Sequence, residues 1–451
     1  MTEPEVASWP AQSDMPMPRQ SLRAFLTSAR SALQSSTTAS STSSSRQPLH
    51  FVIGNESADL DSITSALTYS YLRSHSPPHR LHIPLLNIPR SDISIRPELL
   101  TLLPRAGLDL SHLLTLDDLP PLSVLPAEHT AWTLVDHNAL TGPLTAYASR
   151  VVGCVDHHAE ENAVPKETGE EPRVVETAGS CTSLVVEFLR GTWDEMAAAG
   201  AEGVDSDASN AAADTENDAQ LARLALASIL IDTSALRDAG KTTAHDERAV
   251  AYLENKVRAH DPSYDRAAYL SEIKTAKNDL DRLTTSEVLR KDYKQWTAGG
   301  VQLGVSSVVK ELGWLTEKAE KESEGRGKRE DHQAFTDIIR TFATERNLGV
   351  YAIMTTSHSS SGDFQRELLL SARDASAWEM LEKFRDMAGE QLELERWEQV
   401  RGLAAEAAKV NGHGDGEGEG ERGGMTEVWW QRKVDASRKQ VAPLLRKAMD
   451  G

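Results

Sequence analysis

Short apolar runs alternate with helical patterns through the first half of the chain. The runs rich in β-branched residues, which we expect to be strands, are His50–Ile53, Ala131–Val135 and Val151–Val155. Between the first two, Ser62–Leu72 places Ile63, Ala66 and Leu67 on one face at helical spacing. Alternating strands and helices are typical of a parallel sheet with right-handed crossovers, so this half predicts an α/β fold.

A further apolar segment, Leu221–Ile231, lacks the polar face of a surface element. We expect a buried helix or strand here that ends at Asp232. Beyond about Asp261 the pattern changes to longer charged helices separated by strands. The expected helices are Asp265–Leu283 and Ala375–Val400, and the expected strands are Gln302–Val309 and Leu348–Thr355. This change predicts a second, smaller α/β domain.

Three parts are therefore expected along the chain. Residues 1–47 would form a helix, over Leu22–Leu33, and a linker, because Ser35–Ser45 is almost wholly Ser, Thr and Ala. Residues 48–258 would form the parallel-sheet domain and residues 259–451 the second domain. Three other stretches of biased composition are expected to be mobile surface loops: Glu160–Glu171, Gly191–Ala222 and Asn411–Gly424.

The charge balance narrows the class of function. The 451 residues include 68 acidic and 48 basic side chains, and the net charge of −20 disfavours a general nucleic-acid binder. A polyanionic substrate would need a locally basic groove. No apolar run approaches the roughly 20 residues of a membrane-spanning helix. Cys154 and Cys181 belong to no C-x-x-C pair, which favours a reducing, cytoplasmic compartment.

Carboxylates and histidines follow the expected buried segments. The groups are Asp59 and Asp61 in the run Gly54–Ser62, the triplet Asp136-His137-Asn138, the triplet Asp156-His157-His158, and Asp232. Open α/β sheets bind ligands at the carboxyl ends of their parallel strands, so we expect these groups to share one crevice.

Carboxylates gathered in one crevice repel one another unless cations lie between them. Oxygen ligands suit Mg²⁺ or Mn²⁺, and an imidazole tolerates Mn²⁺. Two such ions about 3.5–4 Å apart can activate a water and stabilise both oxygens in phosphoryl transfer. Each motif alone is equally well explained as a helix cap or a surface cluster. Their ordered conjunction favours a metal site.

These motifs resemble, in order and spacing, the four signature motifs of the DHH phosphoesterases. The resemblance implies a parallel-sheet DHH domain followed by a smaller α/β DHHA2 domain, with the active site in the cleft between them. The subgroup that fits contains family II pyrophosphatases, exopolyphosphatases and prune-type proteins. Asn87-Ile88-Pro89-Arg90, Gly179-Ser180-Cys181 and Lys291–Gln295 resemble segments of fungal cytosolic exopolyphosphatases. Pyrophosphatases of this group carry a histidine metal ligand where this chain has Asn55.

The resemblance also implies roles for the motif residues. The ligands of two divalent cations, Mg²⁺ or Mn²⁺, would be Asp59, Asp61, Asp136, His157 and Asp232. Asp136 and Asp232 would bridge the ions, and Asp156 would orient the histidine pair. His158 would contact substrate, and Asn55 would touch a metal or the terminal phosphate. The implied reaction is hydrolysis of terminal phosphates from inorganic polyphosphate by an activated water, releasing orthophosphate.

Cationic residues of the second half complete the implied site. Ala276–Asp279 and Ser437–Pro443 resemble the two phosphate-binding motifs of the DHHA2 domain. The substrate-binding residues would be Lys277, Arg438 and Lys439, with Arg366 and Ser306 as further candidates. An arginine fork and lysine point charges suit a phosphate chain. Solvated helix faces for the motifs, a surface position for Arg366 and a satisfied hydroxyl for Ser306 are the structural alternatives.

Two other functions use the same fold. NanoRNase-like or RecJ-like phosphodiesterases carry a Gly-Gly-Gly-His type motif in the second domain, and the Gly-rich run Asn411–Gly424 lacks it. A prune-like interaction protein would be marked by loss of metal-binding carboxylates, and all four positions are intact here. We therefore expect a monomeric enzyme that binds inorganic polyphosphate, with no membrane and no nucleic-acid partner.

Overall fold

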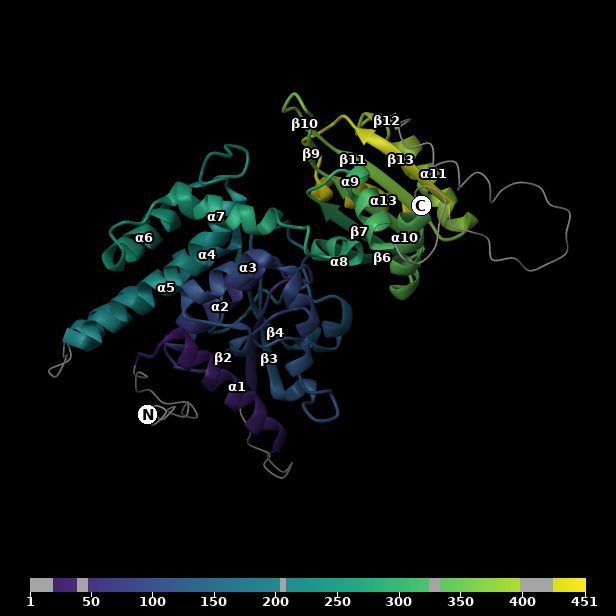
Figure 1. The fold of residues 1–451 in the computed structure, drawn as a ribbon. Coiled ribbons are helices and arrows are strands. Elements are labelled where there is room, and N and C mark those ends of the chain that lie inside the picture. Colours follow the sequence, from purple (N-terminus) through teal and green to yellow (C-terminus); the bar gives the residue numbers. More distant parts are fainter. Residues whose placement is uncertain (1–18, 39–47, 203–207, 324–332, 398–424) are drawn as a thin grey trace, which may run out of the picture. The chain divides into compact units, whose positions relative to one another are not determined.

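The computed structural model describes residues 19–38, 48–202, 208–323, 333–397 and 425–451 (Figure 1). The chain divides into two compact units, Met1–Asp279 (unit 1) and Leu280–Gly451 (unit 2). Among the described helices, none is long and apolar enough to cross a membrane. The expected Gly-rich loop Asn411–Gly424 and most of the linker Ser35–Ser45 lie outside the described residues.

Unit 1 is built on a five-stranded parallel sheet in the order β2-β1-β3-β4-β5. Its strands are β1 (Leu49–Ile53), β2 (His82–Leu85), β3 (Thr130–Val135), β4 (Val151–Asp156) and β5 (Arg173–Val175). All three strands expected from the sequence are present, and each differs from its expected bounds by one residue at most. The predicted parallel α/β fold is confirmed.

Helices cover both faces of this sheet. They are α1 (Leu22–Thr38), α2 (Leu60–Ser74), α3 (Pro97–Leu102), α4 (Cys181–Glu202), α5 (Ala208–Asp232), α6 (Ala244–His260) and α7 (Arg266–Asn278). Val52 faces the core formed with α2, α4, α5 and α6, whereas its neighbours Phe51 and Ile53 face a second core to which α1 contributes. This alternation is the period-two pattern of a strand buried on both sides.

Two expectations for unit 1 need correction or refinement. Gly191–Ala222, expected to be a mobile loop, is helical in its described residues, as the end of α4 and most of α5. The stretch lacks Lys and Arg but is rich in Ala, the strongest helix former, and Trp193 and Leu221 anchor it in the core. Leu221–Ile231, expected to be either a helix or a strand, is helical and forms the second half of α5.

Helix α7 belongs to unit 1, although the sequence pattern changes near Asp261. Tyr269, Leu270 and Ile273 are buried in the core of unit 1, and the Tyr269 hydroxyl donates to the carbonyl of Arg223 at 2.7 Å. Residues 259–279 therefore pack with the first unit, and Lys277 with them.

Unit 2 contains a six-stranded mixed sheet in the order β12-β13-β11-β8-β7-β6. Its strands are β6 (Tyr293–Ala298), β7 (Val301–Val308), β8 (Val350–Thr355), β11 (Glu367–Ala372), β12 (Leu394–Arg396) and β13 (Met425–Gln431). Only β7 and β8 pair in parallel among these neighbours, and a separate two-stranded ribbon joins β9 (Ser357–His358) to β10 (Phe364–Gln365).

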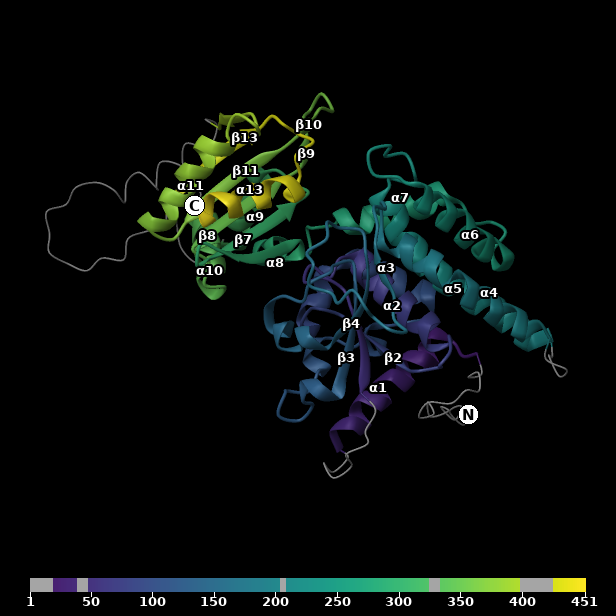
Figure 2. The same ribbon diagram turned by 180° about the vertical axis from the view of Figure 1, so that it is seen from behind.

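The helices of unit 2 are α8 (Thr285–Lys291), α9 (Leu312–Ser323), α10 (Gln333–Glu345), α11 (Ala375–Ala388) and α13 (Arg438–Asp450). Helices α11 and α13 lie side by side and share one core with the sheet (Figure 2). The helix expected over Ala375–Val400 ends at Ala388, so its second half was wrong. Pairing of β12 with β13 overrides the helix propensity of the Glu- and Leu-rich sequence there. Residues 398–400 lie outside the described range.

Candidate active site

The loop after β1 brings two carboxylates to the start of α2. Asp59 is the N-cap of this helix and accepts a hydrogen bond from the backbone N–H of Ser62 at 3.1 Å. Asp61 follows in the first turn, and its side chain is buried. The loop approaches the helix so closely that a Cβ on Gly54 would lie 2.5 Å from the Cβ of Ser62. Only glycine fits there.

Asp136 leaves the end of β3 in the left-handed backbone conformation, with φ of 60°. Its carboxylate is 2% exposed, and its Oδ2 accepts hydrogen bonds from Asn55 Nδ2 and Ser62 Oγ, both at 2.7 Å. Asn55 and Ser62 of the first motif therefore fix the orientation of the Asp136 carboxylate, which belongs to the second motif. Asn55 also receives the N–H of Ser57 on its Oδ1, so its amide is fixed in one orientation.

The histidine pair follows β4. His157 Nδ1 lies 2.8 Å from the carbonyl oxygen of Ala178, to which it must donate its proton. The opposite ring atom, Nε2, lies 3.2 Å from Asp136 Oδ1 and 3.9 Å from Asp61 Oδ2. In the neutral ring Nε2 is an acceptor, so a lone pair faces two carboxylates across these distances.

His158 is held by the fully buried Asp156. Its Nδ1 lies 2.9 Å from Asp156 Oδ1, which also accepts the backbone N–H groups of both histidines, and Asn138 Nδ2 donates to Asp156 Oδ2. Burial opposes ionisation of Asp156, but the hydrogen bond and charge of His158, together with the hydrogen bond from Asn138, hold its pKa below the ordinary value. Asp156 is therefore an anion, and in this form it orients His158.

Asp232, at the end of α5, is coupled electrostatically to the same group. Burial, followed by repulsion from Asp61, raises its pKa well above the ordinary value, and the Lys277 ammonium opposes this shift. The pKa of Asp61 is raised too, by burial and then by Asp136 and Asp59. Carboxylates with mutually raised pKa values bind a proton or a metal ion between them.

In unit 1, Asp61, Asp136 and His157 lie close together, and Asp59 and Asp232 interact electrostatically with Asp61. We call this group the acidic cluster: Asp59, Asp61, Asp136, His157 and Asp232. Ligand atoms of Asp136, His157 and His158 lie within 4.8 Å of one another. A donor set of carboxylates and an imidazole nitrogen fits divalent cations.

The substrate residues expected in unit 2 occupy different settings. Arg438, the first residue of α13, donates through its NH1 and NH2 groups to the carbonyl oxygen and to Oδ1 of Asp292, at 2.8 and 2.7 Å. Lys439 follows it and is exposed. Arg366 donates to the carbonyl of Val434 at 2.6 Å.

Ser306 does not fit the role considered for it. It is fully buried, and its hydroxyl bonds the Leu289 carbonyl at 2.8 Å and the Tyr351 hydroxyl at 2.7 Å. A buried hydroxyl with satisfied bonds is a packing element of β7, so we leave Ser306 out of the proposed site.

Sequence reasoning missed the groups that hold Asp61. Ser180 and Thr182 donate to its Oδ1, and the N–H of Cys181 donates to its Oδ2. The triplet 179–181 was noticed only as a family likeness. The available signal was that Gly179 and Ser180 directly precede a helix that starts with Cys-Thr-Ser, because helix N-termini bind anions.

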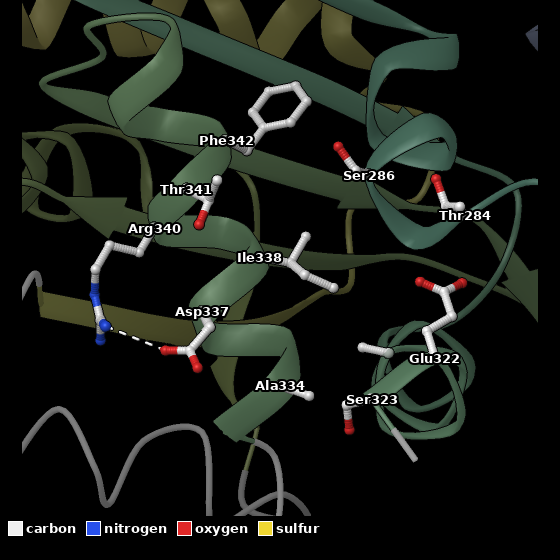
Figure 3. Close-up of a pocket in the computed structure, with 11 residues that line it drawn as sticks. Thr284, Ser286, Glu322, Ser323, Ala334, Asp337, Ile338, Arg340, Thr341 and Phe342 are labelled. Atoms are coloured by element: carbon white, nitrogen blue, oxygen red, sulfur yellow. Dashed lines mark hydrogen bonds and ion pairs between the residues drawn. The ribbon is translucent and has the colours of Figure 1, made fainter. Parts of the chain in front are cut away.

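A cavity of about 720 Å³ lies in unit 2, among α8, α9 and α10. Its lining includes Thr284, Glu322, Ile338 and Phe342, and Asp337 pairs with Arg340 on its wall (Figure 3). None of the lining residues belongs to the acidic cluster or to the cationic motifs. We assign no ligand to it.

Comparison with known proteins agrees with this geometry. Residues 50–229 match the DHH family, N-terminal domain, and residues 271–448 match the DHHA2 domain. The chain is 30% identical over 422 residues to the Schizosaccharomyces pombe protein named "Putative exopolyphosphatase". The aligned region covers 93% of this chain and 96% of that protein. It is 30% identical over 292 residues to human "Exopolyphosphatase PRUNE1", over 64% of this chain and 56% of that protein.

A solved structure shares the fold. It is described as that of a Methanococcus jannaschii "putative family II inorganic pyrophosphatase", with a TM-score of 0.51 and 19% identity, over 89% of this chain and all of that one.

Proposed function

Because this chain belongs to the DHH family and carries a DHHA2 domain, we propose that it is an exopolyphosphatase that releases orthophosphate from the ends of inorganic polyphosphate. The observation that carries the hydrolase chemistry is the lone pair of His157 Nε2, held 3.2 Å from Asp136 Oδ1 inside the acidic cluster. The repulsion between two acceptors at this distance is relieved by a proton on Nε2 or by a divalent cation that both atoms bind, and we propose the cation. We place the enzyme in the cytoplasm and expect no nucleic-acid partner.

Asn55 supports the choice of substrate. Its amide donates to Asp136 at 2.7 Å and so orients a proposed metal ligand. An asparagine at this position also means that no imidazole is present there to bind a cation. One cation is then held more weakly than by a histidine, and Mg²⁺ suffices where an imidazole-rich site would favour Mn²⁺. The relative that is similar over nearly its whole length is named for activity on polyphosphate rather than on pyrophosphate.

The acidic cluster would hold two divalent cations, Mg²⁺ or Mn²⁺, with Asp136 and Asp232 bridging. When bound, such ions supply an activated water and neutralise charge on the phosphate. His158, fixed by Asp156, leaves its Nε2 to contact a phosphate oxygen. Lys277, Arg438, Lys439 and Arg366 would hold the remaining phosphates of the chain.

The substrate is tested by phosphate release from three compounds with Mg²⁺: long-chain polyphosphate, pyrophosphate and a dinucleotide. We expect the highest kcat/KM on long-chain polyphosphate, because several cationic side chains can engage successive phosphates of one chain. Preference for the dinucleotide would instead identify a phosphodiesterase, and preference for pyrophosphate would assign the chain to the pyrophosphatases.

Reversing the charge of Arg438 by Arg438→Glu should raise KM for polyphosphate and lower kcat. One charge-assisted bond to phosphate contributes about 1.5–3 kcal/mol, so we expect at least a tenfold fall in kcat/KM. The variant also places a carboxylate beside Asp292. Arg446→Glu, at an exposed position of the same helix, is the matched control and should leave both constants unchanged. Equal kinetics of the two variants would remove Arg438 from substrate binding.

A further inference from the structure

One short segment touches most of the acidic cluster. This segment, Ala178–Ser183, runs into the start of α4. Its residues give Asp61 four hydrogen bonds: from Ser180 Oγ at 2.6 Å, Cys181 N at 2.7 Å, Thr182 Oγ1 at 2.7 Å and Thr182 N at 3.0 Å. A carboxylate with four donors has one fixed orientation, so the segment sets the direction in which Asp61 offers its remaining lone pairs.

The same segment reaches the other motifs. The carbonyl of Ala178 accepts the proton of His157 Nδ1 and thereby directs the opposite ring atom, Nε2, toward the carboxylates of Asp136 and Asp61. The thiol sulfur of Cys181 accepts the N–H of Asp136 at 3.2 Å. Gly179 packs so tightly on Thr233, the neighbour of Asp232, that a Cβ on Gly179 would lie 2.6 Å from Thr233 Cγ2. Displacement of this segment would therefore disturb Asp61, His157 and the backbone around Asp136 together.

A carboxylate outside the four motifs holds the segment from its other side. Asp246, in the first turn of α6, is fully buried. Its Oδ2 accepts from the N–H of Gly179 at 2.9 Å, and its Oδ1 accepts from Ser180 N at 3.2 Å and Ser183 Oγ at 2.7 Å. The N–H and hydroxyl of Thr243 complete the set at 2.7 and 2.8 Å.

The N-terminus of α4 thus binds two carboxylates. Asp61 accepts its hydrogen bonds within the acidic cluster, and Asp246 accepts them from its position on α6. A helix N-terminus presents several unpaired N–H groups and partial positive charge, which is why it can satisfy both anions. The turn Lys241–Thr243 before α6 helps to hold Asp246 in place. Thr243 is the N-cap of α6 and forms a capping box with Asp246.

We propose that Asp246 is a positioning residue of the metal centre: by holding Ala178–Ser183 in place, it fixes the orientation of Asp61 and the tautomer of His157. The proposal rests on the proposed function only as far as the acidic cluster binds divalent cations. Asp246 itself touches neither metal nor substrate. Its effect is transmitted through hydrogen bonds to the segment, as is typical of groups that orient metal ligands.

The test is the affinity of the purified, metal-free protein for Mn²⁺, measured by calorimetry without substrate. Asp246→Asn replaces one acceptor oxygen by an NH₂ group that faces N–H or O–H donors, and so should displace the segment. We expect a 10–100-fold weaker Mn²⁺ affinity. In kinetic assays kcat should fall at low Mn²⁺ and recover at saturating Mn²⁺, whereas KM for polyphosphate should stay unchanged.

Glu254→Gln, on the same helix as Asp246, is the matched control for loss of a buried carboxylate. Glu254 accepts hydrogen bonds from Arg258 at 3.0 Å and from Arg266 at 2.6 Å, and these residues belong to neither the segment nor the cluster. This variant should lose thermal stability and keep the Mn²⁺ affinity of the wild type. Equal loss of affinity in both variants, or a folded Asp246→Asn protein with wild-type affinity, would overturn the proposal.

Ser183→Ala covers the case in which Asp246→Asn does not fold. It removes a single hydrogen bond to Asp246 and should weaken Mn²⁺ binding by about fivefold, the effect of a bond of about 1 kcal/mol. Unchanged affinity in this variant would also count against the proposal. Because no substrate is present, a wild-type protein inactive on polyphosphate would disprove the proposed function and leave this test valid.

Discussion

Replacing Asp136 by asparagine should lower kcat for phosphate release by at least about a thousandfold. Asp136 is expected to bridge both cations, and its Oδ1 is the carboxylate atom nearest to His157 Nε2, at 3.2 Å. Asparagine keeps the size of the side chain and tolerates the left-handed backbone, so the fold should survive. The measurement is phosphate release with saturating Mg²⁺, together with circular dichroism to confirm folding.

Asp386→Asn is the control, because Asp386 is exposed on α11 of unit 2. It should keep the wild-type kcat. The Asp136→Asn protein without metal should unfold at the same temperature as the wild type or higher, since repulsion between Asp61 and Asp136 is gone. A folded variant with wild-type kcat would exclude Asp136 from the reaction.

Divalent cations should stabilise the protein far more at pH 8 than at pH 5. The pKa values of Asp61 and Asp232 are raised in the fold. Between the unfolded pKa of about 4 and the raised value, the folded protein therefore binds more protons than the unfolded chain. The slope of the unfolding free energy with pH is then negative, and these two groups lower stability as pH rises. Bound cations remove the repulsion.

Thermal unfolding in EDTA and in Mg²⁺ at both pH values tests this expectation. At about 100 times Kd, Mg²⁺ adds about 2.7 kcal/mol, which corresponds to a rise in Tm of about 3–5 °C at pH 8 for a unit or chain of this size. The fall in Tm with pH in EDTA should be smaller for Asp232→Asn, which lacks one of the two raised groups. A rise of equal size at both pH values would show that cations bind elsewhere.

The sequence predicted the features that depend on local pattern. Strand β3 and the Asp136 that follows it were both recognisable, because a β-branched run buried on two faces has few alternatives and its end carries the polar motif. The order of the four motifs predicted that their side chains would gather. Parallel strands that end at one edge of a sheet bring the first three motifs together whatever the lengths of the connections, whereas Asp232 follows helix α5 rather than a strand.

Features that depend on packing were not predictable in this way. The end of α11 at Ala388 is decided by pairing between β12 and β13, and the place of Lys277 in unit 1 is decided by burial of α7. Asp246 lies outside the four motifs and was not singled out from the sequence. Its contact with Gly179 joins residues 67 positions apart, and nothing in the local pattern of either segment announces it.

The left-handed backbone of Asp136 restricts which amino acids can occupy the end of β3. Side chains branched at Cβ are strongly disfavoured at a φ of 60°, and most others are costly, whereas aspartate, asparagine and glycine are tolerated. Aspartate alone among these three carries a charge. The backbone conformation and the proposed cation binding therefore both favour aspartate at this position. A change to asparagine or glycine would keep the bend of the chain, and it would remove the charge on which the proposed cation binding depends.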